Sequence, residues 1–302
     1  MSSLNLFLFG DTGFIGKNVC EHFQRISKIK IYKSSDFKIN IMNRKAIDNA
    51  IRETMPDIVL NFSGMASIEP KDENVVYDIN SFGFLNILES LKKHKFKGSI
   101  FHTSSSYVYQ SSNGKLSEDS PTMPSTHYGC SKLLSEKFGF WFKNYFKVTV
   151  FRLFNIIGRK QKSHFFVPKI VKAFKEKDRE ITLGNLNLIR DFLDVRDFSL
   201  ILEKIILGDN ISLMEARGYE IFNLCSGKGV RLSEVINTLE KITGNRIIIK
   251  EKKAFTTKNG FSSVSQIGSS KNFFEKYNFQ QNYSLKDTLC WMLEEKKIDE
   301  EQ

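Results

Sequence analysis

The clearest candidate for a catalytic pair in this chain is Tyr128 with Lys132, four residues later. In a helix, residues at this spacing share a face. Lowering the pKa of a phenol from about 10 towards neutrality requires roughly 4 kcal/mol, and a unit charge about 4 Å away at an effective dielectric constant near 20 supplies about that much. Lys132 can therefore make Tyr128 an acid–base group. The commoner alternative is a half-exposed tyrosine beside a solvated lysine.

The elements that must position this pair belong to a folded chain of one large or two modest domains. The chain has 302 residues, of which 41% are hydrophobic and 26% charged, as in globular proteins. No apolar run approaches the roughly 20 residues of a membrane helix. The apolar stretch 4–9 runs into glycines without a basic region before it, unlike a signal peptide. We therefore expect a cytoplasmic protein without a membrane partner.

The cysteines and the net charge argue against two further classes of protein. Cys20, Cys130, Cys225 and Cys290 lie far apart, which fits neither a zinc site nor a disulfide framework, so we expect reduced thiols and no metal. The net charge of +11 comes without a basic-aromatic recognition motif. We expect solvated helix faces and no nucleic-acid partner, although a mildly positive cleft for a diphosphate is compatible with this charge.

Short apolar segments alternate with helical patterns over the first half of the chain. The expected strands are residues 4–9, 29–32, 57–62, 99–103 and 148–153, and the expected helices are residues 17–26, 44–53, 75–93 and 131–145. Strand and helix in alternation predict an α/β fold with a doubly wound parallel sheet, covered by helices on both faces.

The first expected strand ends in a glycine-rich turn that opens a helix. The turn has the spacing GxxGxxG, and the residues expected to bind a cofactor there are Gly10, Thr12, Gly13, Phe14, Ile15 and Gly16. Glycines let backbone N–H groups approach a pyrophosphate, whose charge the helix N-terminus favours. Because the turn lies between an apolar strand and an amphipathic helix, we predict a Rossmann-type dinucleotide site and not an ordinary tight turn.

The end of the second strand bears on which dinucleotide binds. An acidic side chain there would bind the ribose hydroxyls of NAD, whereas the 2′-phosphate of NADP requires cations and hydroxyls. Lys33 and Ser34 occupy this place, which favours NADP. Asp36 is the counter-argument, because a register error of two residues would place a carboxylate of the NAD type there.

Further motifs follow in a consistent order. They are Asn-Phe-Ser-Gly at 61–64, Asn80 within 78–83, a serine-rich stretch at 102–109, and Tyr128 with Lys132. Together with the glycine turn, they make nearly the whole chain resemble the extended short-chain dehydrogenase/reductase family, which acts on nucleotide sugars.

The resemblance implies roles for particular residues. In the implied catalytic triad, Ser105 hydrogen-bonds the sugar carbonyl, Tyr128 passes the proton, and Lys132 binds the nicotinamide ribose while stabilising tyrosinate. Ser104 is the alternative to Ser105. Further cofactor contacts are expected from Asn40, Ile41, Phe62, Ser63, Gly64 and Asn80.

Substrate contacts are implied by two further matches. Asn155 lies in an Arg-x-x-Asn-x-x-Gly element, and Arg190 and Arg196 lie in an Arg-Asp-Phe segment whose arginine grips a diphosphate. Ser106 is expected beside them. The alternative for both arginines is a structural ion pair with a neighbouring aspartate.

The residues after the expected catalytic hydroxyl reduce the number of candidate reactions. Dehydratases of the family carry an Asp-Glu pair there and the GDP-fucose epimerase-reductase carries a cysteine, whereas this chain has Ser106 and Tyr107. The sequence motifs of the chain are most similar to those of the GDP-4-keto-6-deoxy-D-mannose reductases that form GDP-D-rhamnose. We predict NADPH-dependent reduction of the C4 ketone of a nucleotide-activated 4-keto-6-deoxy-hexose, in nucleotide-sugar biosynthesis for surface glycans such as lipopolysaccharide. The alternatives are an NAD-dependent 4-epimerase and a non-catalytic NADP-binding sensor.

The resemblance also implies an organisation. A dinucleotide-binding domain is expected at 1–155, with 190–226 returning to it, and a smaller α/β substrate-binding lobe at 156–189 and 227–302. A homodimer is expected to form through the two helical stretches at 75–93 and 131–145.

Overall fold

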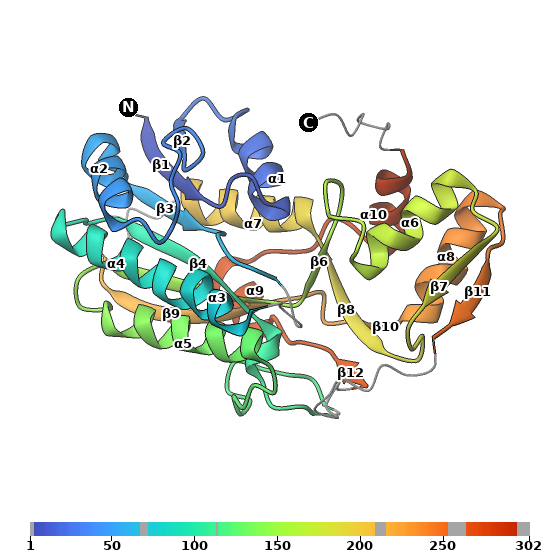
Figure 1. Cartoon of the computed structure of the whole chain (residues 1–302). Coiled ribbons are helices and arrows are strands. Elements are labelled where there is room, and N and C mark those ends of the chain that lie inside the picture. Colours follow the sequence, from blue (N-terminus) through green and yellow to red (C-terminus); the bar gives the residue numbers. More distant parts are fainter. Residues whose placement is uncertain (1–2, 67–71, 113, 209–215, 253–263, 295–302) are drawn as a thin grey trace.

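A six-stranded parallel sheet forms the larger part of the molecule. The computed structural model describes residues 3–66, 72–112, 114–208, 216–252 and 264–294 (Figure 1). The strands are β1 (Leu4–Phe9), β2 (Ile29–Lys33), β3 (Ile58–Asn61), β4 (Ser99–Ser105), β5 (Lys147–Leu153) and β9 (Gly218–Leu224). They are ordered β2-β1-β3-β4-β5-β9, and every neighbouring pair is parallel. The predicted doubly wound sheet is confirmed.

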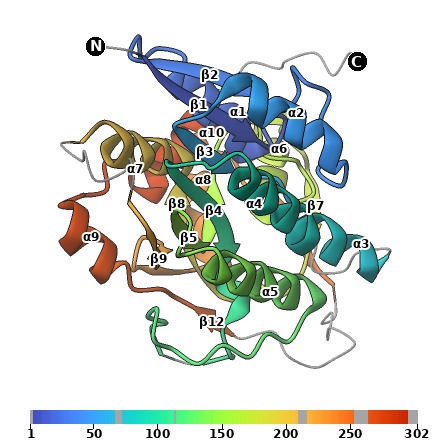
Figure 2. The ribbon, with the colours of Figure 1, turned by 90° about the vertical axis from the view of Figure 1, so that its left-hand side faces the viewer.

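Helices cover both faces of this sheet, as Figure 2 shows for α4 and α5 on one side and α7 and α9 on the other. One face carries α1 (Phe14–Phe23), α7 (Val195–Leu207) and α9 (Lys271–Tyr277), and the other carries α2 (Arg44–Thr54), α4 (Gly83–Lys93) and α5 (His127–Trp141). In β1, Leu6 and Leu8 pack into one apolar cluster, and Phe7 and Phe9 pack into the other. This two-sided burial explains why the strand is apolar throughout. We call the sheet with these helices the sheet lobe.

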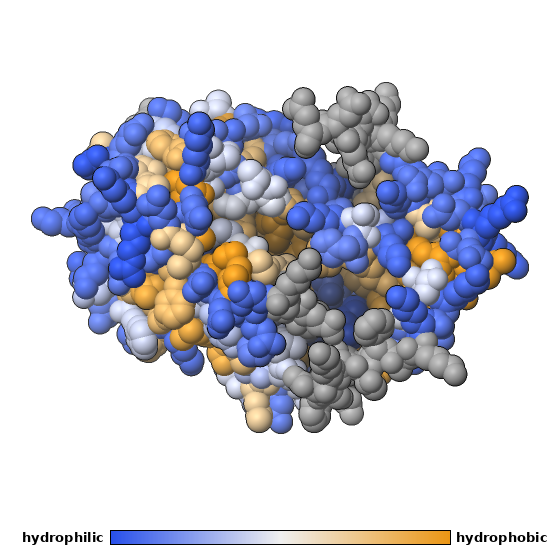
Figure 3. All heavy atoms as spheres, in the orientation of Figure 1, coloured by the Kyte–Doolittle hydropathy of each residue, from blue (hydrophilic) through white to orange (hydrophobic). Residues whose placement is uncertain are grey.

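A third apolar cluster of helices and strands forms what we call the small lobe. It contains α6 (Phe166–Glu176), α8 (Leu232–Thr243) and α10 (Leu285–Leu293), with β7 (Glu180–Leu183) parallel to β11 (Ile248–Glu251). Between the lobes, β8 (Ile189–Asp194) pairs with β6 (Asn155–Ile157), β10 (Gly229–Arg231) and β12 (Ser265–Gln266). The surface is hollowed between the two lobes (Figure 3).

One stretch differs from the expected division of the chain. The predicted limits assign all of 227–302 to the substrate lobe, but α9 packs on the sheet lobe, where Phe273 is fully buried against Phe151 and Phe222. The apolar side chains of this short helix find their partners on β5 and β9. The domain limits as a whole stay a prediction.

The helices that carry the expected site residues begin earlier than predicted. The stretch expected at 131–145 starts at His127, because the Thr126 side chain accepts a hydrogen bond from the Gly129 N–H and caps the helix. The stretch expected at 75–93 is three pieces: α3 (Glu73–Tyr77), a π-helical turn η1 (Asp78–Phe82) and α4. In the described part of the chain, no helix has both the length and the apolarity needed to span a membrane.

Candidate active site

The glycine turn after β1 adopts a conformation that side chains would prevent. Gly10 has φ +80°, and a Cβ there would lie 2.4 Å from the Ser63 nitrogen. A Cβ on Gly16 would lie 2.2 Å from the Gly10 carbonyl oxygen. Gly13 is the N-cap of α1 and provides no side-chain cap, which leaves the first backbone N–H groups of the helix for an anion. Thr12 is exposed, and Phe14 and Ile15 are half-buried.

The exit of β3 lies beside this turn, because β1 and β3 are neighbours in the sheet. In doubly wound sheets, ligands bind at such a reversal of strand order, outside the carboxyl ends of the strands. Phe62 and Ser63 follow β3, and a Cβ on Gly64 would lie 3.0 Å from Asn80 Oδ1 and 3.1 Å from Lys132 Nζ. The fold therefore brings the glycine turn, the β3 exit and Lys132 together.

Asn80 holds the β3 exit against α5. Its Oδ1 accepts a hydrogen bond from the Met65 N–H at 2.8 Å, and its Nδ2 donates to the Met65 carbonyl at 3.2 Å and to Ser131 Oγ at 3.0 Å. The π-helical turn presents it there, and such turns are frequent at functional sites. Through these contacts, Asn80 positions the backbone that follows β3.

Asn40 and Ile41 lie in the loop before α2. The Asn40 side chain accepts a hydrogen bond from the Met42 N–H at 2.9 Å. Ile41 packs so closely on α4 that a Cβ on Gly83 would lie 2.8 Å from its Cγ2. Their predicted contact with a cofactor stays a prediction.

Asp11 lies inside the glycine turn and binds the two serines that follow β2. The sequence analysis missed this residue. Its Oδ1 accepts hydrogen bonds from Ser34 Oγ at 2.6 Å and from the Ser35 N–H at 3.1 Å, and its Oδ2 accepts one from Ser35 Oγ at 2.5 Å. Burial opposes ionisation, but the hydrogen bonds from Ser34 and Ser35 lower the pKa of Asp11. Lys33, the expected cation, pairs with Asp36 at 3.2 Å. A charged residue between two glycines of a phosphate-binding turn was the available signal.

The Ser105 hydroxyl lies beside the Tyr128 phenol, whose pKa this hydrogen-bond contact acts to lower, and Lys132 follows one turn later on the same helix. Ser105 ends β4, and the other two residues lie on α5. Lys132 Nζ donates to the Thr103 carbonyl at 2.9 Å. The first turn of α5 approaches the 3₁₀ turn η2 (Ser106–Val108) so closely that a Cβ on Gly129 would lie 2.3 Å from the Tyr107 carbonyl oxygen. The structure thus assembles the three residues of the expected triad.

The two neighbouring serines of β4 face different surroundings, as alternation along a strand requires. Ser104 Oγ donates to Glu136 Oε1 at 2.5 Å. Glu136 is itself held by a buried bidentate pair with Arg152, at 2.9 Å to Nε and 2.7 Å to Nη2. Ser104 therefore belongs to the polar core behind the site, and Ser105 is the hydroxyl beside Tyr128.

The lowered pKa expected for the phenol of Tyr128 is not found in this structure. Burial raises the pKa of Tyr128 above its usual value, although the Ser105 hydrogen bond opposes the shift. Burial lowers the pKa of Lys132 to about 8, with Glu136 opposing. The Lys132 ammonium, four residues further along α5, donates to the Thr103 carbonyl. The raised pKa keeps the Tyr128 phenol protonated at neutral pH.

A buried histidine braces the strands behind Lys132, and sequence reasoning gave it no role. His102 lies between Asn61 (Nδ2 to Nδ1, 3.0 Å) and Ser135 (Nε2 to Oγ, 2.9 Å), and its ring stacks on Phe84 at 3.8 Å between centroids. Burial, with the Lys132 charge adding to it, holds the pKa of His102 well below its usual value. The imidazole is neutral and ties β3 and β4 to α5.

The expected substrate residues divide into two groups. Arg190, on β8, lies near Tyr107, whose pKa burial raises and the Arg190 charge lowers. Tyr107 in turn stands edge-on to Tyr128, with ring centroids 5.8 Å apart. Ser106 is buried in η2, and Asn155 Nδ2 donates to the Asp191 carbonyl at 3.0 Å. These contacts link Arg190 through Tyr107 to the Ser105–Tyr128 pair.

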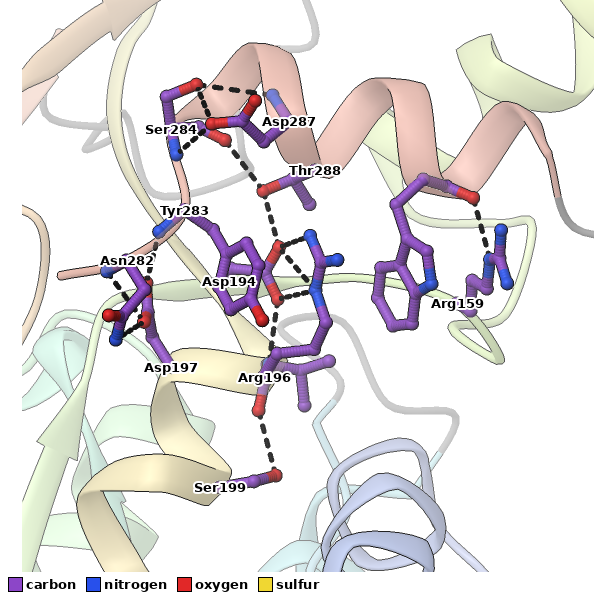
Figure 4. Close-up of polar contacts among 12 residues, drawn as sticks. Arg159, Asp194, Arg196, Asp197, Ser199, Asn282, Tyr283, Ser284, Asp287 and Thr288 are labelled. Carbon is purple, nitrogen blue, oxygen red and sulfur yellow. Dashed lines mark hydrogen bonds and ion pairs between the residues drawn. The ribbon is translucent and has the colours of Figure 1, made fainter. Parts of the chain in front are cut away.

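Arg196 lies at the junction of α7 and α10, as Figure 4 shows. Its Nε and Nη2 donate to the Asp194 carboxylate, at 3.1 Å to Oδ1 and 2.7 Å to Oδ2. The guanidinium lies over the rings of Tyr283 and Trp291, 3.7 Å and 4.1 Å from the centroids. Thr288 Oγ1 also donates to Asp194. The structural ion pair, the alternative stated for Arg196, describes this geometry.

These features define an oxidoreductase-type enzyme with an NAD(P) site. The profile of the NAD dependent epimerase/dehydratase family matches residues 6–209, and the chain belongs to this family.

Among its relatives, the GDP-6-deoxy-D-talose 4-dehydrogenase of Aggregatibacter actinomycetemcomitans is 28% identical, over 83% of this chain and 84% of the relative. The GDP-6-deoxy-D-mannose reductase of Pseudomonas aeruginosa is 26% identical, over 78% and 79%. UDP-glucose 4-epimerases also match. The structure of RMD from Pseudomonas aeruginosa complexed with NADPH has the same fold, with a TM-score of 0.85, 22% identity, and coverage of 96% of this chain and 98% of that one.

Proposed function

We propose that this enzyme reduces the C4 ketone of a GDP-linked 4-keto-6-deoxy-hexose. The two GDP-sugar relatives are named for 6-deoxy-D-talose and 6-deoxy-D-mannose. These two sugars differ only in configuration at C4, so both arise from one 4-keto sugar by hydride delivery to opposite faces. Reduction of this shared 4-keto substrate is the simplest function consistent with both names.

The protonated state of Tyr128 carries the proposal. Reduction of a ketone requires a proton for the nascent alkoxide, and a buried phenol of raised pKa, hydrogen-bonded to Ser105, is ready to donate it. Ser105 would hold the carbonyl oxygen beside the phenol. The Lys132 ammonium would stabilise the tyrosinate left after transfer. Oxidation of an alcohol would require that tyrosinate at the outset, which burial disfavours.

The residues around the glycine turn fit a nicotinamide dinucleotide. The close approaches at Gly10 and Gly16 and the uncapped start of α1 would hold its pyrophosphate. Gly64 and Lys132 would lie at its nicotinamide end. The reduced cofactor supplies the hydride when bound. Arg190, beside Tyr107, would hold the sugar diphosphate.

The test is the oxidation of NADH or NADPH, followed by absorbance, with GDP-, dTDP-, UDP- and CDP-4-keto-6-deoxy sugars. We expect turnover with the GDP sugar, and NMR of the product then assigns the configuration at C4. Tyr128→Phe should bind the cofactor as the wild type does and lose most turnover, by about 100-fold or more. Cofactor binding without oxidation of any 4-keto sugar would contradict the proposal.

A 4-epimerase is the second candidate, because UDP-glucose 4-epimerases are among the relatives. To test for this activity, the protein is incubated with cofactor and UDP-glucose or GDP-sugars. A 4-epimerase would form the C4 epimer of the sugar without a net change in absorbance. A non-catalytic sensor, the remaining alternative, predicts that Tyr128→Phe leaves every measured property unchanged.

We further propose a homodimer that forms through α4, α5 and the turns beside them. Phe82, Phe140, Trp141 and Tyr145 are 43%, 43%, 64% and 46% exposed. Apolar spheres lie among the charged ones over α4 and α5 (Figure 3). Large aromatic side chains are enriched at protein interfaces, and a two-fold axis would bury both copies of this surface at once.

A further inference from the structure

A buried carboxylate lies against the end of β2. Asp11 is 6% exposed and holds Ser34 and Ser35 by three hydrogen bonds. Asp36 and Lys33 neutralise each other in an ion pair. The Asp11 carboxylate has no ion-pair partner among the described residues, and it lies where a Rossmann-type sheet receives the ribose of adenosine.

The side chains that could bind a 2′-phosphate already interact with carboxylates of the protein. Both serine hydroxyls donate to Asp11, so neither is oriented to donate to a phosphate. The Lys33 ammonium faces Asp36. A phosphate monoester carries about −1.5 to −2 charge at neutral pH, and a partly buried carboxylate repels it with little screening by solvent.

We infer that Asp11 makes the adenosine end of this site selective for free ribose hydroxyls, and hence for NAD(H) over NADP(H). This reverses the preference that Lys33 and Ser34 suggest in the sequence. The inference rests on the dinucleotide site of the proposed function, and it assigns the discriminating acid to the glycine turn and not to β2. A carboxylate accepts hydrogen bonds from ribose hydroxyls and has no donor to offer a phosphate.

The test compares ADP-ribose with 2′-phospho-ADP-ribose by isothermal titration calorimetry, which reads the adenosine end without any turnover. The wild type should bind ADP-ribose at least about tenfold more tightly. In Asp11→Asn, the amide oxygen can still accept from Ser34 and the amide group can donate to Ser35, so the loop is kept while the charge is lost. The preference should then shift by at least about tenfold towards the phosphorylated ligand.

Two further carboxamide variants act as controls. Asp178→Asn, beyond α6 in the small lobe, should leave the ratio of affinities unchanged. Asp36→Asn tests the acid that follows β2 directly and should move the ratio less than Asp11→Asn does. A larger effect of Asp36→Asn would overturn the assignment to Asp11. Thermal unfolding of each variant confirms that the fold is retained.

Three results separate this inference from the proposed function. Tighter binding of 2′-phospho-ADP-ribose to the wild type overturns the inference alone. An unchanged ratio in folded Asp11→Asn also overturns it alone. Failure of both ligands to bind would remove the dinucleotide site itself, and with it the proposed function.

Discussion

Lys132 is a buried ammonium whose pKa, about 8, lies inside the range of ordinary buffers. Its usual value is 10.5, so the amine loses its proton in the folded protein well before it would in the unfolded chain. In the proposed reaction the ammonium stabilises the tyrosinate, so we expect the turnover rate to fall as pH rises through about 8. A rate measured from pH 6 to 10 checks this.

The matched control is Lys132→Arg, because arginine stays protonated over the whole range. Its residual rate should show no decline near pH 8, and a wild-type rate that stays level to pH 10 would contradict the assignment. The unfolding free energy gives a second reading. Between about pH 8 and 10.5 the unfolded chain binds more protons at this lysine, so its contribution to stability rises with pH.

Which residues could be found from the sequence depends on where their partners lie. Ser105, Tyr128 and Lys132 sit in motifs whose spacing is visible along the chain. Asp11 lies between two glycines of the turn, but its partners Ser34 and Ser35 follow β2, and the partners of His102 lie on β3 and α5. Their roles follow only from the hydrogen bonds that the fold assembles.

At the scale of elements, the docking of α5 on η2 sets the distance between the tyrosine and the serine. Gly129 permits the contact, since a Cβ there would lie 2.3 Å from the Tyr107 carbonyl oxygen and 2.8 Å from Pro124 Cβ. We expect Gly129→Ala to push the first turn of α5 outward and to lower turnover by about 100-fold, as small misplacements of catalytic groups do. Steady-state kinetics measures the loss.

Gly184→Ala is the matched control for this change, because nothing lies within 4 Å of a Cβ at Gly184. It should keep the wild-type rate and thermal stability. Binding of ADP-ribose should survive Gly129→Ala, because the glycine turn after β1 is separate from η2. Unchanged turnover in Gly129→Ala would show that this contact does not position Tyr128.

The strands expected in the first half of the chain were accurate, whereas among the four expected helix starts only that of α2, at residue 44, was. Buried apolar runs mark β1 and β3 directly. The start of α5 at His127 depends on one cap from Thr126, and the π-helical turn at 78–82 depends on the contacts of Asn80 with Met65 and Ser131. Periodicity alone carries neither signal.

At the scale of the whole molecule, we expect two copies to associate through α4 and α5. Trp141→Glu places a charge on the most exposed of the four aromatic side chains of that surface and should convert a dimer into a monomer. Light scattering after size-exclusion chromatography measures the mass. Ile248→Glu, at a residue 65% exposed on β11 of the small lobe, is the control and should leave the mass unchanged. A wild-type monomer would contradict the proposed dimer.

The path of the chain between the lobes bears on how such an enzyme can change its substrate in evolution. β5 leads into β6 through the single residue Phe154, and β8 leads directly into α7, so sheet and small lobe alternate along the sequence. Because α9 then returns to the sheet lobe before α10, no single stretch of the gene encodes the small lobe. A single crossover cannot exchange the small lobe as a unit, so we expect new sugar specificity to arise by substitutions in place.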